Sequence, residues 1–503
     1  MLTTTLSSTP SNMRTHLIKP TAIRLNLALA TVAVVALLTG CFRSHSGAPN
    51  LDLNKSSAPR NIIVIIGDGM GPQQLALAEL YHARVGGRSA NALHRFISSA
   101  AQGTHLPLPE TALVNDSACA ASQLAGGCRC DPQGIGLDRW GKPCKTISKR
   151  AQQLGMRVGL ISDTRLSHAT PAGFAAQVKH RNQEHEIAAQ MVGSGFDLLL
   201  SGGSEYFPPP LLQQAADKGY RVVSDRKQLN GTKSLPVLGL FAKGHMSDAF
   251  SEGSNGEPTL AEMTDRALAL LDNPRGFFLM IEAGQIDTAA HHNDAGWVLR
   301  EMFRLSKVLE RILEFISNRD DTLVILTADH ETGGMGLSYR AIAGEKPSDT
   351  YDFLTKQTLL GLARQSAPLR SHLKTSATDR SDKYRSLKGE IARLGIEPLS
   401  ADELLRITNS SEVTAHSGDS NDCHHDESLL ETSYKRFYPH QQYRTPAMLG
   451  RELGARMGVV WATGGHTSTP VPILCHGAGQ EICKGWFTTQ SFGERLIGLT
   501  DRL

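Results

Sequence analysis

The chain has 503 residues, of which 40% are hydrophobic and 20% charged, so it can bury a large core and is neither disordered nor fibrous. Aromatic residues make up only 6%, and no aromatic-rich basic stretch occurs, which argues against a protein that stacks on nucleic-acid bases. The formal charge of +3 comes from residues 1–40, which hold basic residues and no acid, and the remainder has 49 Lys and Arg against 49 Asp and Glu, so bulk charge predicts binding neither to nucleic acid nor to an anionic membrane.

Residues 1–40 have the pattern of a secretory signal peptide. Basic residues precede an apolar run from Leu25 to Leu38, and small residues follow it before Cys41. The run is short for a membrane span, although a retained anchor and ordinary secretion remain alternatives. Leu38-Thr-Gly-Cys41 resembles the bacterial lipoprotein signal, which implies an exported protein with a lipid anchor at Cys41 in the cell envelope or periplasm. Phe42 in place of Asp favours the outer membrane of a Gram-negative cell.

Cysteine usage agrees with export, because disulfides are favoured outside the cytoplasm. Seven further cysteines are present: Cys119, Cys128, Cys130, Cys144, Cys423, Cys475 and Cys483. Cys475 with Cys483, or a pair among Cys128, Cys130 and Cys144, could close a short loop. The odd count leaves at least one thiol free or shared between molecules. A zinc cluster at Cys128 and Cys130 lacks a second close cysteine pair, Cys119 is expected to pack in the core, and the connectivity stays open.

After a linker at residues 41–59, short apolar runs predict strands, and the first of them, which is β-branched, is typical of a strand buried on both faces. These runs are 61–66, 157–161, 196–200, 277–281 and 322–327. Helical patterns lie between them at 146–154, 184–192, 260–271 and 298–317. The alternation predicts an α/β fold with a large, mainly parallel sheet and helices on both faces. Ligands bind at the carboxyl ends of such strands, which is where Asp68, Glu282, Asp329 and His330 fall.

The segment from about residue 337 to residue 457, called here the 337–457 segment, breaks this alternation. It is rich in charge and serine, with a helical pattern at 385–394 and a polar run at 410–428. We expect a peripheral insertion near the site, within one domain that spans 60–503. It is expected to shape substrate choice or to form a contact in a homodimer.

Two strand ends begin patterns typical of metal ligands. Asp68 lies in Gly67-Asp-Gly-Met-Gly71, whose spacing departs from the dinucleotide fingerprint. Taken alone, this motif is compatible with a metal ligand at Asp68, a structural turn or a nucleotide-binding loop. Asp287 and His291 are four residues apart where a helix would start, so both could hold one ion. Glu282 lies at the preceding strand end, and a solvated polar helix is the alternative.

Further candidates follow two other predicted turns. Asp329 and His330 end a strand, and His466 lies in a glycine-rich turn; each alone is as well explained by capping or a hydrogen bond. Together these acids and histidines exceed what one zinc needs, and two close metals could clamp the attacking and leaving oxygens of a phosphoryl transfer.

A hydroxyl and a guanidinium complete the set. Ser117 opens a predicted helix at 116–125, where the dipole and free N–H groups favour an oxygen nucleophile and a phosphate, although an ordinary helix cap is the alternative. The GxSxG motif is missing, which argues against a Ser-His-Asp hydrolase. Thr170 offers a hydroxyl ligand, and the planar fork of Arg181 suits bidentate contact with phosphate.

In this order, the motifs resemble those of the alkaline phosphatase family. The matching segments are Gly67-Asp-Gly-Met-Gly71, Asp116-Ser-Ala118, Gly134-Ile-Gly-Leu-Asp138, His168-Ala-Thr-Pro171, Glu282 with Asp287 and His291, Ala328-Asp-His330 and Thr463-Gly-Gly-His-Thr467. The resemblance covers about 60–336 and resumes at 459–497.

The resemblance implies two zinc ions and one magnesium ion. One zinc would be held by Asp287, His291 and His466, and the other by Asp68, Asp329 and His330, with Ser117 joining the second as the nucleophile. The magnesium would be held by Asp68, Thr170 and Glu282, and Arg181 would bind the substrate phosphate. His168 stands where some members carry Asp; it is expected beside these ligands rather than among them, which leaves the third ion open.

The implied reaction is the hydrolysis of phosphate monoesters, through a phosphoserine, to an alcohol and inorganic phosphate. A phosphodiesterase or sulfatase of the same superfamily is the alternative, but no Cys-x-Pro-x-Arg sulfatase motif occurs, and Thr170 with Glu282 favours a monoesterase. A lipoprotein that binds metal, phosphate or a partner without catalysis is a more distant alternative.

Overall fold

The structure is a computed structural model that describes residues 58–86, 91–341, 351–373, 380–400, 403 and 436–502. The chain forms two compact units, residues 1–52 and 53–503, and only the second contains described residues. The predicted signal peptide, Cys41, nearly all of the linker, Cys423 and the polar run at 410–428 lie outside the described residues. No helix in the described part is both long and apolar enough to cross a membrane.

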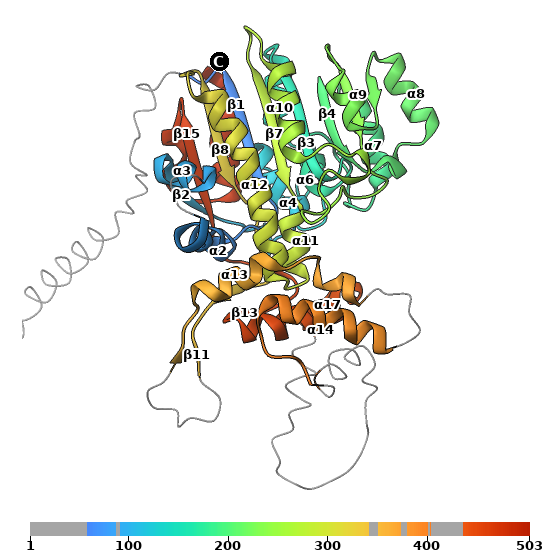
Figure 1. Ribbon diagram of the computed structural model, residues 1–503. Coiled ribbons are helices and arrows are strands. Elements are labelled where there is room, and N and C mark those ends of the chain that lie inside the picture. The colour runs from blue at the N-terminus through green and yellow to red at the C-terminus, as the bar shows by residue number, and fades with distance from the viewer. Residues whose placement is uncertain are drawn as a thin grey trace, which may run out of the picture. The chain divides into compact units, whose positions relative to one another are not determined.

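A ten-stranded mixed sheet forms the centre of the second unit (Figure 1). Its strands are β1 (Asn61–Gly67), β2 (Ala101–Leu106), β3 (Arg157–Arg165), β4 (Leu198–Gly202), β5 (Arg221–Val223), β6 (Val237–Leu240), β7 (Phe277–Ala283), β8 (Thr322–Thr327), β15 (Val471–Gly477) and β16 (Gly485–Thr488). They lie in the order β16-β2-β15-β8-β1-β7-β3-β4-β6-β5. Only β15 runs antiparallel to its neighbours in this sheet, so the mainly parallel sheet predicted from the sequence is confirmed.

The central strand β1 shows why the sheet is covered on both faces. All of its residues are buried, and alternate side chains enter two different hydrophobic clusters, Ile63 and Ile65 on one face and Ile62 and Val64 on the other. This follows from the two-residue period of a strand. Ile66 pairs with Glu282 on one side and with Thr327 on the other, so the three strands end side by side.

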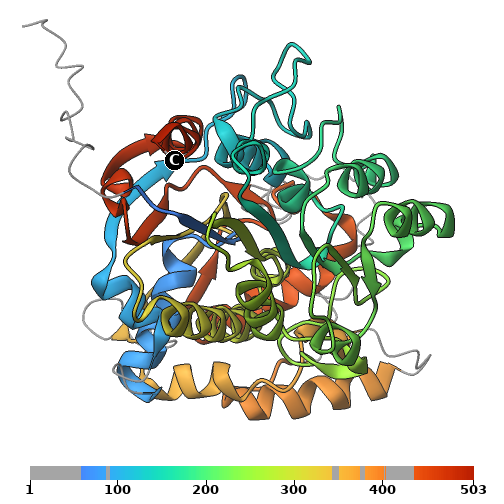
Figure 2. The same ribbon diagram turned by 90° about the horizontal axis from the view of Figure 1, so that it is seen from above.

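Helices cover both faces of the sheet, as predicted. One face carries α2 (Pro72–Tyr81), α3 (Ala92–Ser99), α9 (Arg226–Asn230), α10 (Leu260–Leu271) and α12 (Ala295–Ile316). The other carries α4 (Ser117–Gly126), α5 (Ile147–Gln153), α6 (Ala169–Gly173), α7 (Glu184–Gly193), α8 (Pro209–Asp217) and α18 (Thr489–Gly498). Seen from above, the yellow α12 lies on one side of the sheet, and the cyan α4 and the red α18 lie on the other (Figure 2).

The predicted elements differ from the observed ones mainly at their ends. β8 and α10 have the predicted bounds, whereas β3 continues to Arg165 and β7 to Ala283. Helix α12 begins at Ala295, because the Asp294 side chain accepts a hydrogen bond from the Trp297 N–H and so caps the helix earlier. Strands β2, β5, β6, β15 and β16 were not predicted from the sequence.

The 337–457 segment follows the short strand β10 (Met335–Leu337), which pairs with β13 (Val459–Trp461) after it. It contains β11 (Arg340–Ala341), β12 (Tyr351–Asp352), α13 (Lys356–Arg364), α14 (Arg380–Leu394) and α17 (Gln441–Arg456). These helices lie at the end of the sheet where α11 (Gln285–His291) follows β7 (Figure 1). Gln365 Nε2 and the Leu369 N–H donate to the Asp294 carboxylate at 2.8 and 2.7 Å, which joins the segment to the start of α12.

Three disulfides are present in the described residues: Cys119–Cys130, Cys128–Cys144 and Cys475–Cys483. The last is one of the predicted pairs, and Cys128–Cys144 is another. Cys119, which was expected only to pack, is cross-linked to Cys130. Because both Cys128 and Cys130 are bonded, neither is available to a zinc cluster. The disulfides are typical of an extracytoplasmic protein.

Candidate active site

The carboxyl ends of β1 and β8 bring Asp68, Asp329 and His330 together. Their ligand atoms lie within 4.8 Å of one another, and all three side chains are buried. His330 Nε2 is 3.5 Å from Asp68 Oδ1 and 3.3 Å from Asp329 Oδ2. Two oxygens and one nitrogen at such spacing can hold one cation.

A second group lies beside the first and is richer in imidazole. His291 Nε2 is 3.2 Å from Asp287 Oδ2 and 3.3 Å from His466 Nε2. The His466 ring stacks on the His330 ring with the centroids 3.6 Å apart, and Asp287, His330 and His466 also lie within ligand distance of one another. The two groups are therefore adjacent.

Hydrogen bonds from outside the cluster orient two of these histidines. His291 Nδ1 bonds to the Gly464 carbonyl at 2.8 Å, and His466 Nδ1 bonds to the Asn115 carbonyl at 3.0 Å. A carbonyl accepts only from a protonated nitrogen, so in the neutral form of each imidazole Nε2 carries the lone pair that faces the cluster. Histidines that bind metals are commonly fixed in this way.

A third group is formed by Asp68, His168 and Glu282, whose ligand atoms also lie within 4.8 Å of one another. His168 Nδ1 is 3.8 Å from Glu282 Oε1, so His168 lies closer to this position than expected. Thr170, close to His168 in the sequence, is buried at the start of α6. Ser162 and Thr164 donate to Glu282 Oε2 and hold this carboxylate in place.

Ser117 is the first residue of α4 and is buried next to the first group. Its Oγ is 3.1 Å from His330 Nε2. Arg181 lies between Asp116 and His168, with Nη1 3.2 Å from Asp116 Oδ2 and Nη2 3.2 Å from His168 Nε2. The guanidinium that was predicted to bind phosphate is thus positioned by the residue that caps the helix of Ser117.

The polar atoms of the cluster fit cations. Several are buried without a hydrogen-bond partner among the described residues: both oxygens of Asp68, Asp329 Oδ2, Glu282 Oε1, His168 Nδ1 and Thr170 Oγ1. Buried polar atoms are rarely left unpaired, and buried carboxylates are costly unless they are paired or coordinate a metal. A cation among these atoms would satisfy them together.

The pKa values show the same excess of negative charge. Burial and the nearby Asp329 carboxylate raise the pKa of Asp68 well above its usual value, and burial with the Asp287 carboxylate raises the pKa of Asp329 to about 7. Asp287 differs: although burial favours its neutral form, His291 and the other imidazoles hold its pKa well below the usual range. The first and third groups therefore lack positive charge, whereas the imidazole-rich group does not.

Some residues of the site gave no clear signal in the sequence. The sequence indicates Asp116 as a helix start and as part of the Asp116-Ser-Ala118 motif, but it does not predict the contact of its side chain with Arg181. Thr332 Oγ1 donates to Asp287 Oδ1 at 2.5 Å, and His440 of the 337–457 segment packs on His291 with the ring centroids 4.6 Å apart. A threonine after Asp329-His330 could have been suspected from its closeness in sequence, but nothing in the sequence places His440 here.

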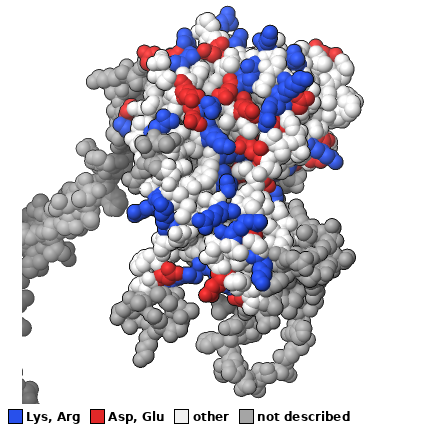
Figure 3. Space-filling model, in the orientation of Figure 1, with Lys and Arg blue, Asp and Glu red and all other residues white. Residues whose placement is uncertain are grey.

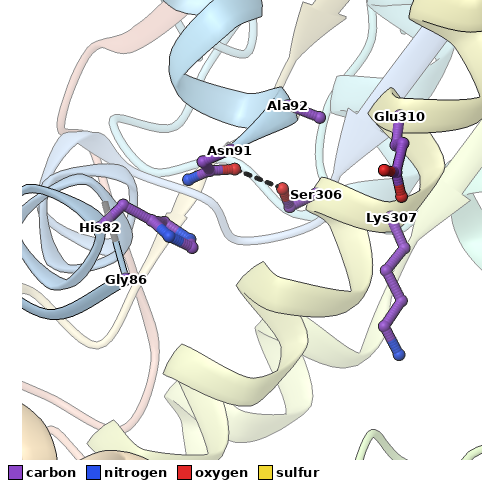
Figure 4. A pocket seen from close by; sticks show the side chains of 7 residues that line it. All are labelled: His82, Gly86, Asn91, Ala92, Ser306, Lys307 and Glu310. Carbon is purple, nitrogen blue, oxygen red and sulfur yellow. Dashed lines mark hydrogen bonds between the residues drawn. The ribbon is translucent and has the colours of Figure 1, made fainter. Parts of the chain in front are cut away.

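A separate hollow of about 200 Å³ contains none of these residues (Figure 4). It is lined by His82, Gly86, Asn91, Ala92, Ser306, Lys307 and Glu310. The Ser306 hydroxyl donates to Asn91 Oδ1 at 2.6 Å across it. The hollow therefore plays no part in the site.

The position of this cluster at the carboxyl edge of a doubly covered sheet places the chain among metal-dependent α/β hydrolytic enzymes. A family model described as alkaline phosphatase matches residues 59–497. The chain belongs to the alkaline phosphatase family, whose members hydrolyse phosphate monoesters.

Individual relatives agree with the family match. Alkaline phosphatase 3 of Bacillus subtilis (strain 168) is 27% identical over 478 residues, which cover 91% of this chain and 92% of that protein. Alkaline phosphatase 4 of the same organism is 34% identical over 326 residues, 61% of this chain and 70% of that protein. The crystal structure of Thermus thermophilus alkaline phosphatase matches with a TM-score of 0.74 at 28% identity, covering 91% and 94% of the two chains.

Proposed function

We propose that this chain hydrolyses phosphate monoesters by attack of Ser117, at a centre that holds two zinc ions and one magnesium ion. The observation that carries the proposal is the position of Ser117 Oγ, 3.1 Å from His330 Nε2 and beside carboxylate oxygens that have no hydrogen-bond partner among the described residues. Family membership supports the substrate class.

Ser117 Oγ loses its proton and forms a bond to phosphorus while the ester P–O bond breaks and the alcohol departs. Water then attacks the phosphoserine, which releases inorganic phosphate and restores the hydroxyl. Each displacement inverts the configuration at phosphorus, so the overall reaction retains it. The N-terminal position of Ser117 on α4 also favours the negative charge of the phosphoryl group.

Arg181 binds the non-bridging oxygens of the phosphoryl group, which carry the negative charge in the transition state. Its guanidinium is planar and can donate two parallel hydrogen bonds to two oxygens. Asp116 and His168 orient it before the substrate arrives, so little reorganisation is needed when negative charge develops there.

The ligand sets for zinc are Asp287, His291 and His466, and Asp68, Asp329 and His330; magnesium is assigned to Asp68, Thr170 and Glu282. Bound ions supply Lewis-acid chemistry, lowering the pKa of the Ser117 hydroxyl and neutralising charge on the leaving oxygen. His168 adds a nitrogen near the third position, a ligand less suited to magnesium than oxygen is. We expect His168→Asp to raise the magnesium content measured by elemental analysis.

The test compares p-nitrophenyl phosphate, the corresponding bis-ester and the corresponding sulfate as substrates of the purified protein with zinc and magnesium. We expect the monoester to be preferred, EDTA to abolish turnover, and Ser117→Ala to reduce it by at least about 10³-fold. Preference for the bis-ester or the sulfate would replace the proposal with a diesterase or sulfatase. No turnover by folded, metal-loaded protein would leave a binding function.

We also propose that the protein is exported and anchored through a lipid on Cys41. The three disulfides support export, and the lipoprotein-like sequence before Cys41 supports the anchor. Cys41→Ser should move the protein from the membrane fraction to the soluble fraction of the envelope. A mass spectrum of the mature N-terminus without a lipid would contradict the anchor.

A further inference from the structure

The 337–457 segment contributes two aromatic side chains to one wall of the site. The ring of His440 meets that of His291 nearly edge to face, with the centroids 4.6 Å apart and the planes at 75°. The ring of Tyr443 lies 4.5 Å from that of His292 and 5.7 Å from that of His440. Both His440 and Tyr443 remain partly exposed.

The role of His440 is not to cap a helix. It occupies the N-cap position of α17, but its side chain makes no capping hydrogen bond. The preferred residues there are Ser, Thr, Asp and Asn, and other helices of this chain use them, as at Thr259 of α10 and Asp294 of α12. What the side chain of His440 does contact is His291.

The position of His440 is fixed from two sides. The Gly464 N–H donates to the Phe437 carbonyl at 3.0 Å, and the Thr463 hydroxyl donates to the same carbonyl. The chain before His440 therefore runs along the turn that carries His466. On the other side α17 packs closely on the end of α11, since a Cβ at Gly450 would lie 2.6 Å from the His292 carbonyl oxygen.

The wall lies on the side where the organic part of the ester must leave. Ser117 contacts His330, and His466 stacks on His330 and contacts His291. In a displacement at phosphorus the leaving oxygen departs opposite the attacking one. A phosphoryl group attacked by Ser117 therefore directs its leaving oxygen toward the imidazole-rich group, and the organic group toward the rings beyond His291.

We propose that His440 and Tyr443 form the subsite for the leaving group, so that this enzyme favours phosphate monoesters of aromatic alcohols over those of small aliphatic alcohols. The proposal rests on the proposed function, because it assigns Ser117 as the nucleophile. Two partly exposed rings offer stacked or edge-to-face contacts to a planar group. Aromatic pairs contribute about 0.5–1.5 kcal/mol beyond area burial, roughly 2–13-fold in binding.

The experiment measures kcat and KM for phenyl phosphate and glycerol phosphate with the zinc- and magnesium-loaded full chain and its variants. His440→Ala should lower the ratio of the two kcat/KM values by about 2–13-fold, chiefly through a higher KM for the aryl ester. The ratio of each variant is compared with the ratio of the wild type. The difference in intrinsic reactivity between the two esters is the same in both ratios and therefore cancels. His440→Phe, which keeps a planar ring without nitrogen, should restore the ratio, and Tyr443→Ala should lower it like His440→Ala.

His476→Ala is the matched control. His476 pairs with Val324 near the amino end of β8, whereas the site lies beyond its carboxyl end, so the ratio should stay at the wild-type value. Zinc content and melting temperature are measured for every variant. A smaller zinc content in His440→Ala would show that His440 acts through His291, and would overturn the proposal.

Two other results would also overturn it: an equal loss on both esters, or a His440→Phe variant that behaves like His440→Ala. Failure of the proposed function looks different. In that case the wild-type protein turns over neither ester, or Ser117→Ala retains the wild-type rate, and no ratio can be assigned to the rings.

Discussion

Two clusters of three carboxylates, buried or nearly so, lie in the described part of this molecule, and they are neutralised in different ways. In the first, called here the arginine cluster, Asp163, Glu252 and Glu301 surround the buried guanidinium of Arg304. Arg304 Nη1 is 3.2 Å from Asp163 Oδ2, and its Nε is 2.9 Å from Glu252 Oε1. The protein supplies its own cation there.

The second cluster, called here the carboxylate centre, consists of Asp68, Glu282 and Asp329. None of the three forms an ion pair with Lys or Arg within the described part of the chain; their nearest imidazoles are those of His330 and His168, and burial lowers the pKa of these histidines to about 4 and about 3. Burial raises the pKa of Asp163 to about 6, although the Arg304 guanidinium opposes the increase. Burial and the neighbouring Asp329 carboxylate act in the same direction on Asp68 and raise its pKa well above the usual value.

The two clusters are close in sequence. Asp163 stands between Ser162 and Thr164, whose hydroxyls bind Glu282. The same short stretch therefore serves both clusters. The difference between them indicates that the fold tolerates buried carboxylates where a guanidinium is built in, and leaves a place for external cations where it is not.

In Figure 3 basic and acidic side chains are interspersed over the sheet-bearing part of the face drawn. On this face the two signs of charge are therefore mixed rather than separated.

The largest effect is expected from removing the built-in cation. Arg304→Met leaves the buried carboxylates of Asp163 and Glu301 without their cation, whereas Glu252 keeps Lys307; breaking a buried ion pair typically costs about 3–5 kcal/mol. We expect that loss in the free energy of unfolding measured by urea titration. Arg311→Met on the same helix is the control, because Arg311 pairs with Glu314 at the surface and such pairs contribute about 0–1 kcal/mol.

Arg304→Met also tests whether the built-in guanidinium is what separates the arginine cluster from a site for external cations. If zinc or magnesium raised the melting temperature of Arg304→Met more than that of the wild type, the arginine cluster would have become a cation site. The two clusters would then differ only in occupancy.

The next effect concerns the carboxylate centre. Asp329→Asn should lower kcat/KM for p-nitrophenyl phosphate by about 10²–10³-fold, the usual loss when one preorganised electrostatic group is removed. In EDTA the variant should be at least as stable as the wild type, because it removes one buried negative charge. Asn can still accept the hydrogen bonds that the Gly69 and His330 N–H groups donate to Asp329 Oδ1.

Asp287→Asn gives the contrast within the site. Its carboxylate lies among imidazoles and has a lowered pKa, so its loss should destabilise the EDTA-treated protein. Melting temperatures of both variants in EDTA decide the point. A decrease in both would show that the excess negative charge of the carboxylate centre has no effect on stability.

Much of this arrangement could be predicted from local sequence. Asp68, Glu282 and Asp329 follow short apolar runs, and parallel strands bring their carboxyl ends to one edge. Ser117 was suspected because helix starts favour oxygen nucleophiles and phosphate. The family resemblance then combined these separate signals into one site.

The rest depends on contacts between distant parts of the chain. Arg304 on α12 meets Asp163 of β3, and no local pattern distinguishes this arginine from a surface arginine on an amphipathic helix. β15 inserts antiparallel between β8 and β2, which only the tertiary fold decides. His440 follows a long charged stretch, so its packing on His291 could not be predicted.

A smaller effect is expected where the two clusters meet. Thr164 Oγ1 donates to Glu282 Oε2 at 2.9 Å, so Thr164→Val should weaken binding at the third cation position by about 10–100-fold, as is usual when a hydrogen bond to a metal ligand is lost. A magnesium titration followed by the melting temperature measures this. Thr164→Ser keeps the hydroxyl and should retain wild-type affinity; if it binds magnesium as weakly as Thr164→Val, the hydroxyl is not what positions Glu282.

The smallest effect is the contribution of Glu301, in the arginine cluster, to the dependence of stability on pH. Burial raises the pKa of Glu301 to about 7, despite the neighbouring Arg304, from a usual value of 4.5. Between these values the folded protein binds more protons than the unfolded chain, so the free energy of unfolding falls as pH rises. Between pH 6 and pH 8 Glu301 should account for a fall on the order of 1 kcal/mol.

Glu301→Gln isolates this contribution. Gln keeps an oxygen that can accept from the Ala249 N–H and from Trp297 Nε1, but it has no proton to lose. The wild type should therefore lose more stability than the variant from pH 6 to pH 8 in urea titrations. Because the built-in cation, not a metal, serves this cluster, the difference should be the same in EDTA as with zinc and magnesium; a difference that vanished when the metals were added would mean that the two clusters titrate as one.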